Sequence, residues 1–367
     1  MEIGKKLQIA REAIGYTLEK SALESGIGKS SICEFEKEKR APKFAQLVKL
    51  AKIYHKTVEF FLSDQVFAKN ILLWRCKPDS ADFKETEAKF TELCEQYHKL
   101  ELIMNEKRQE PLPSNTFDKD SFDFSEAEKL GESVCRIMEL GDIPSASLKK
   151  VLEERYFVKV FHLPFSGSTI STVSPVYGPA VLLNSVSREW RRNFDLAHEL
   201  FHLITWKSFR NSTSEENYPS ENEEKWANTF ASRLLLPTDS VKRRIENYIN
   251  NNCISLESLD EIAREYSVSL EALLWRLISL YRLSPDKVKE IIEGAKENKP
   301  RYPARKSDQP DIYPERYCSL AVRALNEGRL STAQFAKYMG LTYKKAQEYL
   351  REDTEELRDE TIAIPVA

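Results

Sequence analysis

The sequence predicts a predominantly helical α+β protein, because helical periodicity runs through most of the chain and strand-like patterns are confined to one short region. Apolar residues recur at helical spacing through residues 1–64 and again after Ser240. We therefore expect an all-helical head, a core with a small sheet and a helical C-terminal part. The strands are expected at Phe157–Leu163, Thr169–Val173 and Pro179–Asn184, and the main helices at Phe83–Arg108, Ser125–Leu140, Ser147–Arg155, Glu189–Trp206 and Glu221–Leu236.

Composition narrows the class of protein. The chain has 367 residues, a formal net charge of -3 and 31% charged residues, which is typical of a globular protein with at least one sizeable core. It has no apolar stretch of the roughly 20 residues that span a bilayer and no apolar segment at its start. The six cysteines are scattered without a close pair, which favours reduced thiols. We expect a cytoplasmic protein with no membrane partner.

Stretches rich in proline and charge suggest where the chain divides. We expect two linkers, one over Gln109–Phe122 and one over 299–314. The helix at Phe83–Arg108 carries an apolar stripe, which either docks onto a neighbouring domain or forms a homodimer. Two stretches, Leu259–Leu280 and Phe335–Thr342, have a helix-turn-helix-like rhythm without an obvious basic face, so small packed helical bundles are favoured for both. The expected segments are a head at 1–64, a helical connector and linker at 65–121, a mixed domain with trailing helices at 122–298, a linker at 299–314 and a small helical unit at 315–367.

The most informative motif is the sequence HExxH at His198–His202. Residues four apart lie on one face of a helix, so His198 and His202 can reach a single zinc ion. Glu199 projects beside that face, where it can hold and deprotonate a water molecule as general base. The chain holds only five histidines and the residues around the motif are apolar, as a buried active-site helix requires.

A catalytic zinc site needs a third protein ligand and one open position. The apolar face of the helix at Glu221–Leu236 places Glu224 inward and rotates Glu223 away from that face. Asn228 follows Glu224 by one helical turn and is expected to support the site from behind the ligands. Asp195 precedes His198 by three residues; it either bonds a ligand histidine or lies near the start of the helix, and the second role is favoured.

Three sequence blocks carry a family resemblance: Arg192–Leu203, Glu224–Ala231 and Leu234–Pro237. They resemble the pattern HELxH, ExxANxFA and LLMP of the ImmA/IrrE metallopeptidases, over about residues 122–281. The resemblance implies a gluzincin-like fold with a small antiparallel sheet, the cofactor Zn2+, the ligands His198, His202 and Glu224, and Glu199 as catalytic base. Phe201 stands where glycine is frequent and could narrow the cleft, and Leu236 stands where methionine is common.

The same resemblance implies a protein substrate, a repressor of the helix-turn-helix type. Strand Pro179–Asn184 could pair with an extended substrate if it edges the cleft, although its apolar run is equally typical of a buried strand. A donor for the oxyanion is also needed, and Tyr177, Tyr218 and Arg191 are all candidates. His162 is expected to be structural.

Residues 1–64 resemble the phage-repressor (XRE) type of helix-turn-helix domain. The resemblance rests on residues from Ile3 to Lys52, including Gly15-Tyr16-Thr17, Ser25-Gly26-Ile27-Gly28 and Lys39-Arg40-Ala41-Pro42. The head holds 12 Lys and Arg against 9 Asp and Glu, a mild basic excess. Three glutamates, Glu34, Glu36 and Glu38, lie along the expected reading helix, so protein recognition by the head stays an alternative to DNA binding. The expected DNA contacts are Lys29, Ser30, Ser31, Lys37, Lys39 and Arg40.

Taken together, these patterns predict a transcription regulator that binds promoter or operator DNA and is coupled to a zinc-dependent endopeptidase. Two alternatives stay open. One is a DNA-binding transcription factor with a non-catalytic metal site, and the other is an antitoxin-like partner of a toxin. Glu199 favours catalysis, because a structural zinc site needs no general base.

Overall fold

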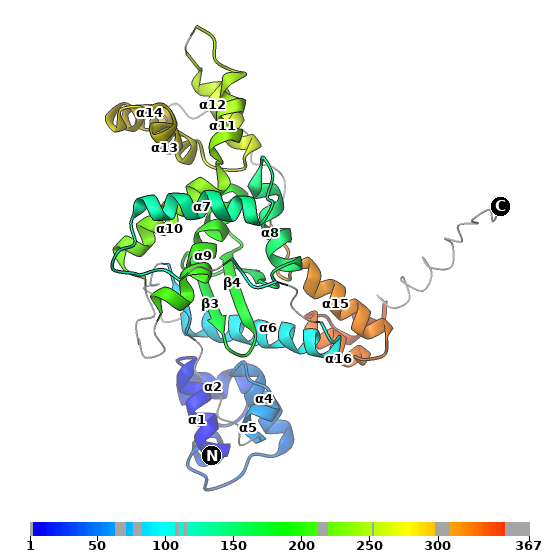
Figure 1. Ribbon diagram of the computed structural model, residues 1–367. Coiled ribbons are helices and arrows are strands. Elements are labelled where there is room, and N and C mark those ends of the chain that lie inside the picture. Colours follow the sequence, from blue (N-terminus) through cyan, green and yellow to red (C-terminus); the bar gives the residue numbers. More distant parts are fainter. Residues whose placement is uncertain are drawn as a thin grey trace, which may run out of the picture.

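The computed structural model describes residues 3–62, 71–75, 83–106, 110–113, 116–210, 219–251, 253–297 and 309–348 (Figure 1). Helices dominate and one small sheet lies between them, which confirms the predicted class. The strands are β1 (Leu73–Trp74), β2 (Lys159–Leu163), β3 (Thr169–Ser174) and β4 (Gly178–Asn184). The helices are α1 (Ile3–Ala13), α2 (Leu18–Ser25), α3 (Lys29–Glu36), α4 (Phe44–Ile53), α5 (Val58–Leu62), α6 (Phe83–Ile103), α7 (Phe124–Ile137), α8 (Pro144–Glu154), α9 (Glu189–Phe209), α10 (Glu221–Leu235), α11 (Thr238–Glu246), α12 (Leu256–Glu265), α13 (Leu270–Tyr281), α14 (Pro285–Glu297), α15 (Glu315–Asn326) and α16 (Thr332–Tyr338).

The predicted helices and strands are confirmed, with small shifts at their ends. The first predicted strand begins later than expected, because Phe157 has a φ of 53° and cannot continue an extended strand. Parts of the two predicted linkers, and everything after residue 348, lie outside the described residues. Strand β1 was not predicted, since two residues are too short to show a period.

The head is a cluster of short helices, α1 to α5, around its own apolar core. Leu7, Ile32, Phe35 and Leu50 are buried in it. Thr17 caps α2 by accepting a hydrogen bond from the backbone N–H of Lys20 at 3.1 Å. These local features hold α2 and α3 in the relation of a helix-turn-helix.

The sheet has the strand order β1-β3-β4-β2, and it is mixed. β4 pairs antiparallel with β3 through a tight turn, but it pairs parallel with β2. The expectation of an antiparallel sheet was therefore wrong for this pair. Of the two interpretations of strand Pro179–Asn184, the buried strand is confirmed: β4 lies between β3 and β2, which occupy both of its backbone edges, so it cannot pair with a substrate.

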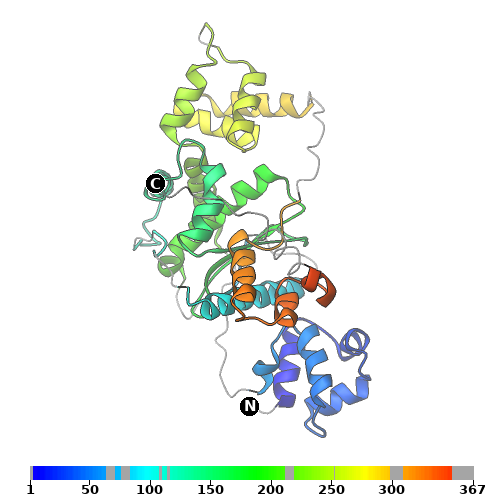
Figure 2. The ribbon, with the colours of Figure 1, turned by 90° about the vertical axis from the view of Figure 1, so that its right-hand side faces the viewer.

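Helices cover both faces of the sheet. On one face, residues such as Val160 and Val181 pack with α7, α9 and α10 in the larger core. On the other, Phe161 and Leu182 pack with α6, α15 and α16 (Figures 1 and 2). Because strand side chains alternate between faces, neighbouring residues of one strand serve the two cores.

Helix α6 docks onto the sheet and the C-terminal helices with its apolar stripe. Leu93, Tyr97 and Leu100 are buried there, as the docking interpretation of this helix expected. A buried ionic group reinforces the contact: Glu101 accepts from the Lys159 ammonium at 2.8 Å and from the Arg316 guanidinium at 2.7 Å. The stripe proposed as a homodimer surface is therefore covered within the chain.

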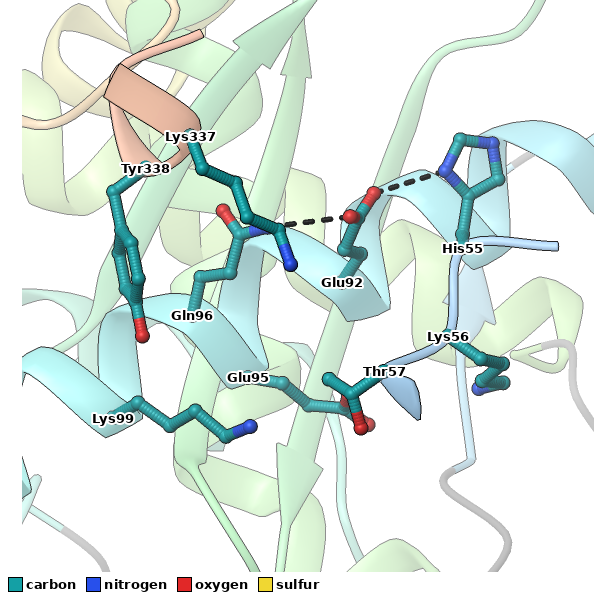
Figure 3. A pocket seen from close by; sticks show the side chains of 9 residues that line it. All are labelled: His55, Lys56, Thr57, Glu92, Glu95, Gln96, Lys99, Lys337 and Tyr338. Atoms are coloured by element: carbon teal, nitrogen blue, oxygen red, sulfur yellow. Dashed lines mark hydrogen bonds and ion pairs between the residues drawn. The ribbon is translucent and has the colours of Figure 1, made fainter. Parts of the chain in front are cut away.

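The head meets α6 and α16 at a small polar pocket (Figure 3). In Figure 3, His55 from the head and Gln96 from α6 both point at Glu92, and the His55 Nδ1 lies 2.9 Å from the Glu92 carboxylate. The pocket has a volume of only about 40 Å³, enough for a few water molecules. It is therefore a polar contact between elements rather than a site for a larger ligand.

Helices α11 to α14 extend the larger core at the end of the molecule opposite to the head (Figure 2). The stretch Leu259–Leu280 forms α12, a turn and α13, and most of its apolar residues, among them Ile262, Leu273 and Leu277, are buried against the core, as a packed bundle requires. The stretch Phe335–Thr342 likewise packs against α15 and α6. Within the described part of the chain, no helix combines the length and apolar character that crossing a membrane requires.

Candidate metal centre

The HExxH residues lie in the middle of α9, the helix that packs against the sheet. His198, Glu199 and His202 are at most 2% exposed, and the apolar residues that flank them are buried as well. The helix begins at Glu189 and continues to Phe209, so both histidines are in regular helix, one turn apart. Their rings therefore project from the same face, as the spacing predicts.

Helix α10 brings acidic residues to that face. Ser220 caps it, and a reciprocal capping box with Glu223 fixes its first turn, where the helix dipole favours carboxylates. Gly131 on α7 allows α10 to pack closely, because a Cβ at that position would lie 2.7 Å from the Phe230 carbonyl oxygen. These constraints hold Glu224 opposite the two histidines.

The three side chains converge on one point. The Nε2 atoms of His198 and His202 are 3.3 Å apart, and the Glu224 carboxylate oxygens lie 3.3 Å from the first and 3.4 Å from the second. A tetrahedral zinc with ligands at roughly 2.0–2.1 Å separates its ligand atoms by about 3.3–3.4 Å. Among the described residues this is the one group of three potential ligands close enough to share an ion.

Burial and charge at this point suit a cation. Oε1 of Glu224 is buried and accepts no hydrogen bond from the described residues. Burial would raise the pKa of Glu224, but the rings of His198 and His202 lower it to about 2, so the carboxylate is ionised. Burial lowers the pKa of His198 to about 3, which leaves that imidazole neutral. The residues present therefore fit a divalent metal ion such as zinc.

Glu199 is separate from this trio and is held by the sheet. Its carboxylate accepts a hydrogen bond from the hydroxyl of Thr169 on β3. Burial raises its pKa, against the opposing influence of His202 and of the nearby hydroxyls of Ser171 and Thr169. A buried carboxylate with a raised pKa and a fixed orientation is suited to exchange protons with a nearby water.

Asn228 lies behind His198, as its position one turn after Glu224 predicts. Its Oδ1 is 3.0 Å from the Nδ1 of His198. The position of Asp195 fits neither of the two roles considered for it. It lies in the second turn of α9, beyond the helix start, and its carboxylate pairs with Arg75 and Arg191. The helix-start expectation for Asp195 was therefore wrong.

Glu223 is buried, which corrects the expectation that it is rotated away from the inward face. It is 1% exposed, binds the guanidinium of Arg210, and its Oε1 lies 3.8 Å from the Nδ1 of His202. Burial opposes protonation of His202, yet Glu223 and Glu224 together raise its pKa to about 9. The capping box turns Glu223 back toward α9, which helical periodicity alone does not reveal.

The structure also corrects the expectation for Phe201 and narrows the candidates for the oxyanion donor. Phe201 does not narrow a cleft, because it is fully buried in the core with its ring against Phe122 and Phe230. Tyr177 is buried in the core on the α6 side of the sheet, away from α9. Of the other oxyanion candidates, Arg191 pairs with Asp195, and Tyr218 lies outside the described residues.

Sequence reasoning missed Arg75, which directly follows β1 and reaches the site from there. Its guanidinium donates to Asp195 and, at 2.9 Å, to Oδ1 of Asn228, and its Nε lies 3.7 Å from Glu224. Strand β1 precedes the blocks that carry the family resemblance, so no motif pointed to it. His162, by contrast, is buried in β2, where its backbone N–H donates to the Ile312 carbonyl, in keeping with a structural role.

In the head, the expected contact residues lie at both ends of α3. Glu36 faces inward and pairs with Arg11 at 2.6 Å, so its carboxylate does not belong to the outer face of the helix. Arg40 lies over the ring of Phe35 and 3.6 Å from Glu34. Lys29, Ser30, Lys37, Lys39 and Arg40 are exposed and Ser31 is half-buried.

The fold and the site together define a class: a helix-turn-helix head joined to a domain in which His198, His202 and Glu224 converge closely enough to hold a metal ion. Comparison with protein families supports both parts. Residues 153–277 match the model of the IrrE N-terminal-like domain, a peptidase family, and residues 7–61 match a helix-turn-helix family. The chain therefore carries an IrrE-like peptidase domain behind an N-terminal helix-turn-helix domain.

Individual relatives resemble shorter parts of the chain. A stretch of 71 residues is 34% identical to the HTH-type transcriptional regulator ImmR of Bacillus subtilis strain 168; it covers 19% of this chain and 56% of that protein. The chain thus spans little more than half of this relative. A solved structure of a Mycobacterium tuberculosis transcriptional regulator aligns over 51% of each chain with 17% identity and a TM-score of 0.31, a value too low to carry an argument.

The site predicts that zinc binding depends on Glu224. We expect one zinc ion per chain in the purified protein, measured by inductively coupled plasma mass spectrometry. Glu224→Gln should lose it, with a fall in affinity beyond the roughly 10–100-fold that loss of a supporting residue causes. Glu221→Gln changes an exposed carboxylate of the same helix and should retain the metal. Equal zinc contents in the two variants would rule Glu224 out as a ligand.

Proposed function

We propose that the protein is a DNA-binding transcription regulator whose residues 122–298 act as a zinc-dependent endopeptidase on a repressor-type protein. The observation that carries this proposal is the set of 3.3–3.4 Å separations among His198, His202 and Glu224, with Glu199 on the same helix. A structural zinc site would close its fourth position with protein and would need no Glu199.

The chemistry of such a site assigns roles to the chain's own residues. A bound zinc ion would act as a Lewis acid that lowers the pKa of water and polarises the scissile carbonyl. Glu199 takes the proton of the attacking water and passes it to the leaving amine, as a general base and then a general acid. The hydrogen bond that Glu199 accepts from the Thr169 hydroxyl keeps the Glu199 carboxylate oriented during both proton transfers.

A cleft of about 600 Å³ adjoins the metal centre on the side of Arg75 and Asn228, which lie behind His198, and it is proposed to receive part of the substrate. Its described lining does not include the three proposed ligands or Glu199. Trp190, Phe194 and Trp275 supply aromatic surface along the same cleft. Aromatic walls with polar groups between them suit a polypeptide segment, whose side chains alternate in character. A repressor-type substrate is in keeping with the resemblance to the ImmA/IrrE peptidases.

The head, residues 1–64, is proposed to bind promoter or operator DNA through α3. The N-terminal residues of a reading helix contact base edges, and Lys29 and Ser30 are exposed at that end. Lys39 and Arg40 follow the helix where phosphate contacts are expected. The similarity to ImmR, a helix-turn-helix transcriptional regulator by its name, supports this role.

Peptidase activity is tested by removing the proton carrier alone. Glu199→Gln should lower the rate at which the protein cleaves a repressor-type substrate by roughly 100- to 10,000-fold, because an amide cannot accept the proton of the attacking water. The variant should keep its zinc, since Glu199 is not one of the three ligands. Repressor proteins encoded beside the gene are the substrates to incubate, with cleavage followed by mass spectrometry and Glu221→Gln as the control.

The outcomes distinguish three interpretations of the protein: an endopeptidase, a factor with a non-catalytic metal site, and an antitoxin-like partner. Cleavage by the wild type and none by the zinc-loaded Glu199→Gln protein supports the endopeptidase. Intact partners with both proteins would contradict it and favour a non-catalytic metal site. Formation of a stable complex with a neighbouring toxin instead would favour the antitoxin-like alternative.

DNA binding by the head should depend on salt and on Lys29. Lys29→Ala is expected to weaken binding to the gene's own promoter and, if Lys29 meets a phosphate, to reduce the slope of log affinity against log salt by about 1. Lys150→Ala removes the same charge on α8 and should leave binding unchanged. Fluorescence anisotropy over a range of salt concentrations measures both. Failure of the wild type to bind any nearby DNA would assign the head to protein recognition.

A further inference from the structure

Arg75 directly follows β1, and its backbone is held in place beside the sheet. Its N–H donates to the Thr169 carbonyl, which continues the pairing of β1 with β3. The preceding Trp74 is fully buried, and its indole N–H donates to Glu87 at 2.7 Å. Gly167 leaves room for the indole, since a Cβ there would lie 2.9 Å from the ring. The position of the Arg75 side chain is thus set by the fold.

The guanidinium of Arg75 is shared between two groups next to the metal ligands. One Nη donates to the buried Asp195 carboxylate, which also pairs with Arg191 at 3.1 Å. The other Nη donates to Oδ1 of Asn228 at 2.9 Å. That same Oδ1 lies 3.0 Å from the Nδ1 of His198. The amide oxygen therefore lies between a guanidinium and an imidazole.

The chemistry of these three groups leaves one arrangement of protons. A guanidinium only donates hydrogen bonds, so the Asn228 atom that faces Arg75 must be the oxygen. An amide oxygen only accepts, so the Nδ1 of His198 must carry a hydrogen. A neutral imidazole with its proton on Nδ1 has a free lone pair on Nε2, the atom that faces Glu224 and His202.

We propose that Arg75 is a positioning residue that fixes the orientation of the Asn228 amide and, through it, the metal-binding tautomer of His198. Without the guanidinium, the amide can turn over and present its NH2 group to Nδ1. The imidazole then carries its proton on Nε2, where it blocks the lone pair that a metal needs.

This assignment rests on the proposed metal-binding role of His198, and it extends the site beyond the matched peptidase domain. The family match begins at residue 153, whereas Arg75 comes from the segment between the head and α6. The segment between the head and α6 would therefore supply part of the peptidase site. A domain cut at residue 122 or 153 would lack this residue.

The tautomer of His198 can be read directly in the full-length, metal-free protein. Two-bond 1H–15N correlation spectra of histidine-labelled protein resolve the tautomers, and the chain has only five histidines. His198 is assigned through the loss of its signals in His198→Ala. We expect Nδ1–H in the wild type and a mixture of tautomers, or Nε2–H, in Arg75→Met. Co2+ affinity, read from its visible absorption, should fall roughly 10–100-fold in the same variant.

Two further variants distinguish this relay, in which Arg75 acts on His198 through Asn228, from simple structural support by Arg75. Arg191→Met removes the other partner of Asp195 and should leave the tautomer unchanged, since Arg191 is bonded to Asp195 and not to Asn228. Asn228→Asp replaces the amide with a carboxylate. Both carboxylate oxygens accept hydrogen bonds, so either one can face the Nδ1 of His198 without a residue that fixes the orientation. We therefore expect Arg75→Met combined with Asn228→Asp to restore the Nδ1–H tautomer of His198.

The result that overturns the proposal is a wild-type tautomer in Arg75→Met, or a failure of Asn228→Asp to restore it. If Arg75→Met does not fold, Asn228→Leu provides the test, because it removes the acceptor while Arg75 stays in place. The Asn228→Leu variant must then show a mixture of His198 tautomers, and a wild-type spectrum would refute the relay. Because the spectra are recorded without metal, failure of the wild type to bind zinc would count against the proposed function alone.

Discussion

The contact between the middle of α9 and the first turn of α10 is the constraint on which the rest of the structure depends. It puts an ionised carboxylate against two buried imidazoles, in a place where unpaired charge costs several kcal/mol. The surrounding packing serves this contact. Gly131 lets α7 press α10 inward, and the Ser220 cap fixes the turn that carries Glu224. A shared cation would offset the cost of the buried charge.

The small sheet connects this centre to the remainder of the chain. β3 holds Glu199 through Thr169 on one face, while its other face and β1 pack against α6. Helix α6 in turn contacts the head at His55 and the C-terminal unit at Arg316. The head and the metal centre are therefore linked by packed secondary structure. Arg75, which directly follows β1, comes from the segment between the head and α6, so this segment contacts the metal centre as well.

The sequence predicted what depends on local periodicity and missed what depends on distant neighbours. One helical turn places His198 beside His202, and the apolar face of α10 turns Glu224 inward; the structure brings these three together. The burial of Glu223 and Phe201 differed from expectation, because periodicity tells which face a residue occupies but not what packs against it. Arg75 meets residues 120 and 153 positions away, and the parallel pairing of β4 is equally non-local. No pattern within one segment contains that information.

The most direct test of the central claim is anomalous X-ray scattering from crystals grown with zinc. A difference map from data collected above and below the zinc absorption edge should show one strong peak per chain. The peak should lie roughly 2.0–2.1 Å from the Nε2 atoms of both His198 and His202 and from a Glu224 oxygen. A peak elsewhere, or none at saturating zinc, would contradict the account of α9 and α10 as a metal-binding pair.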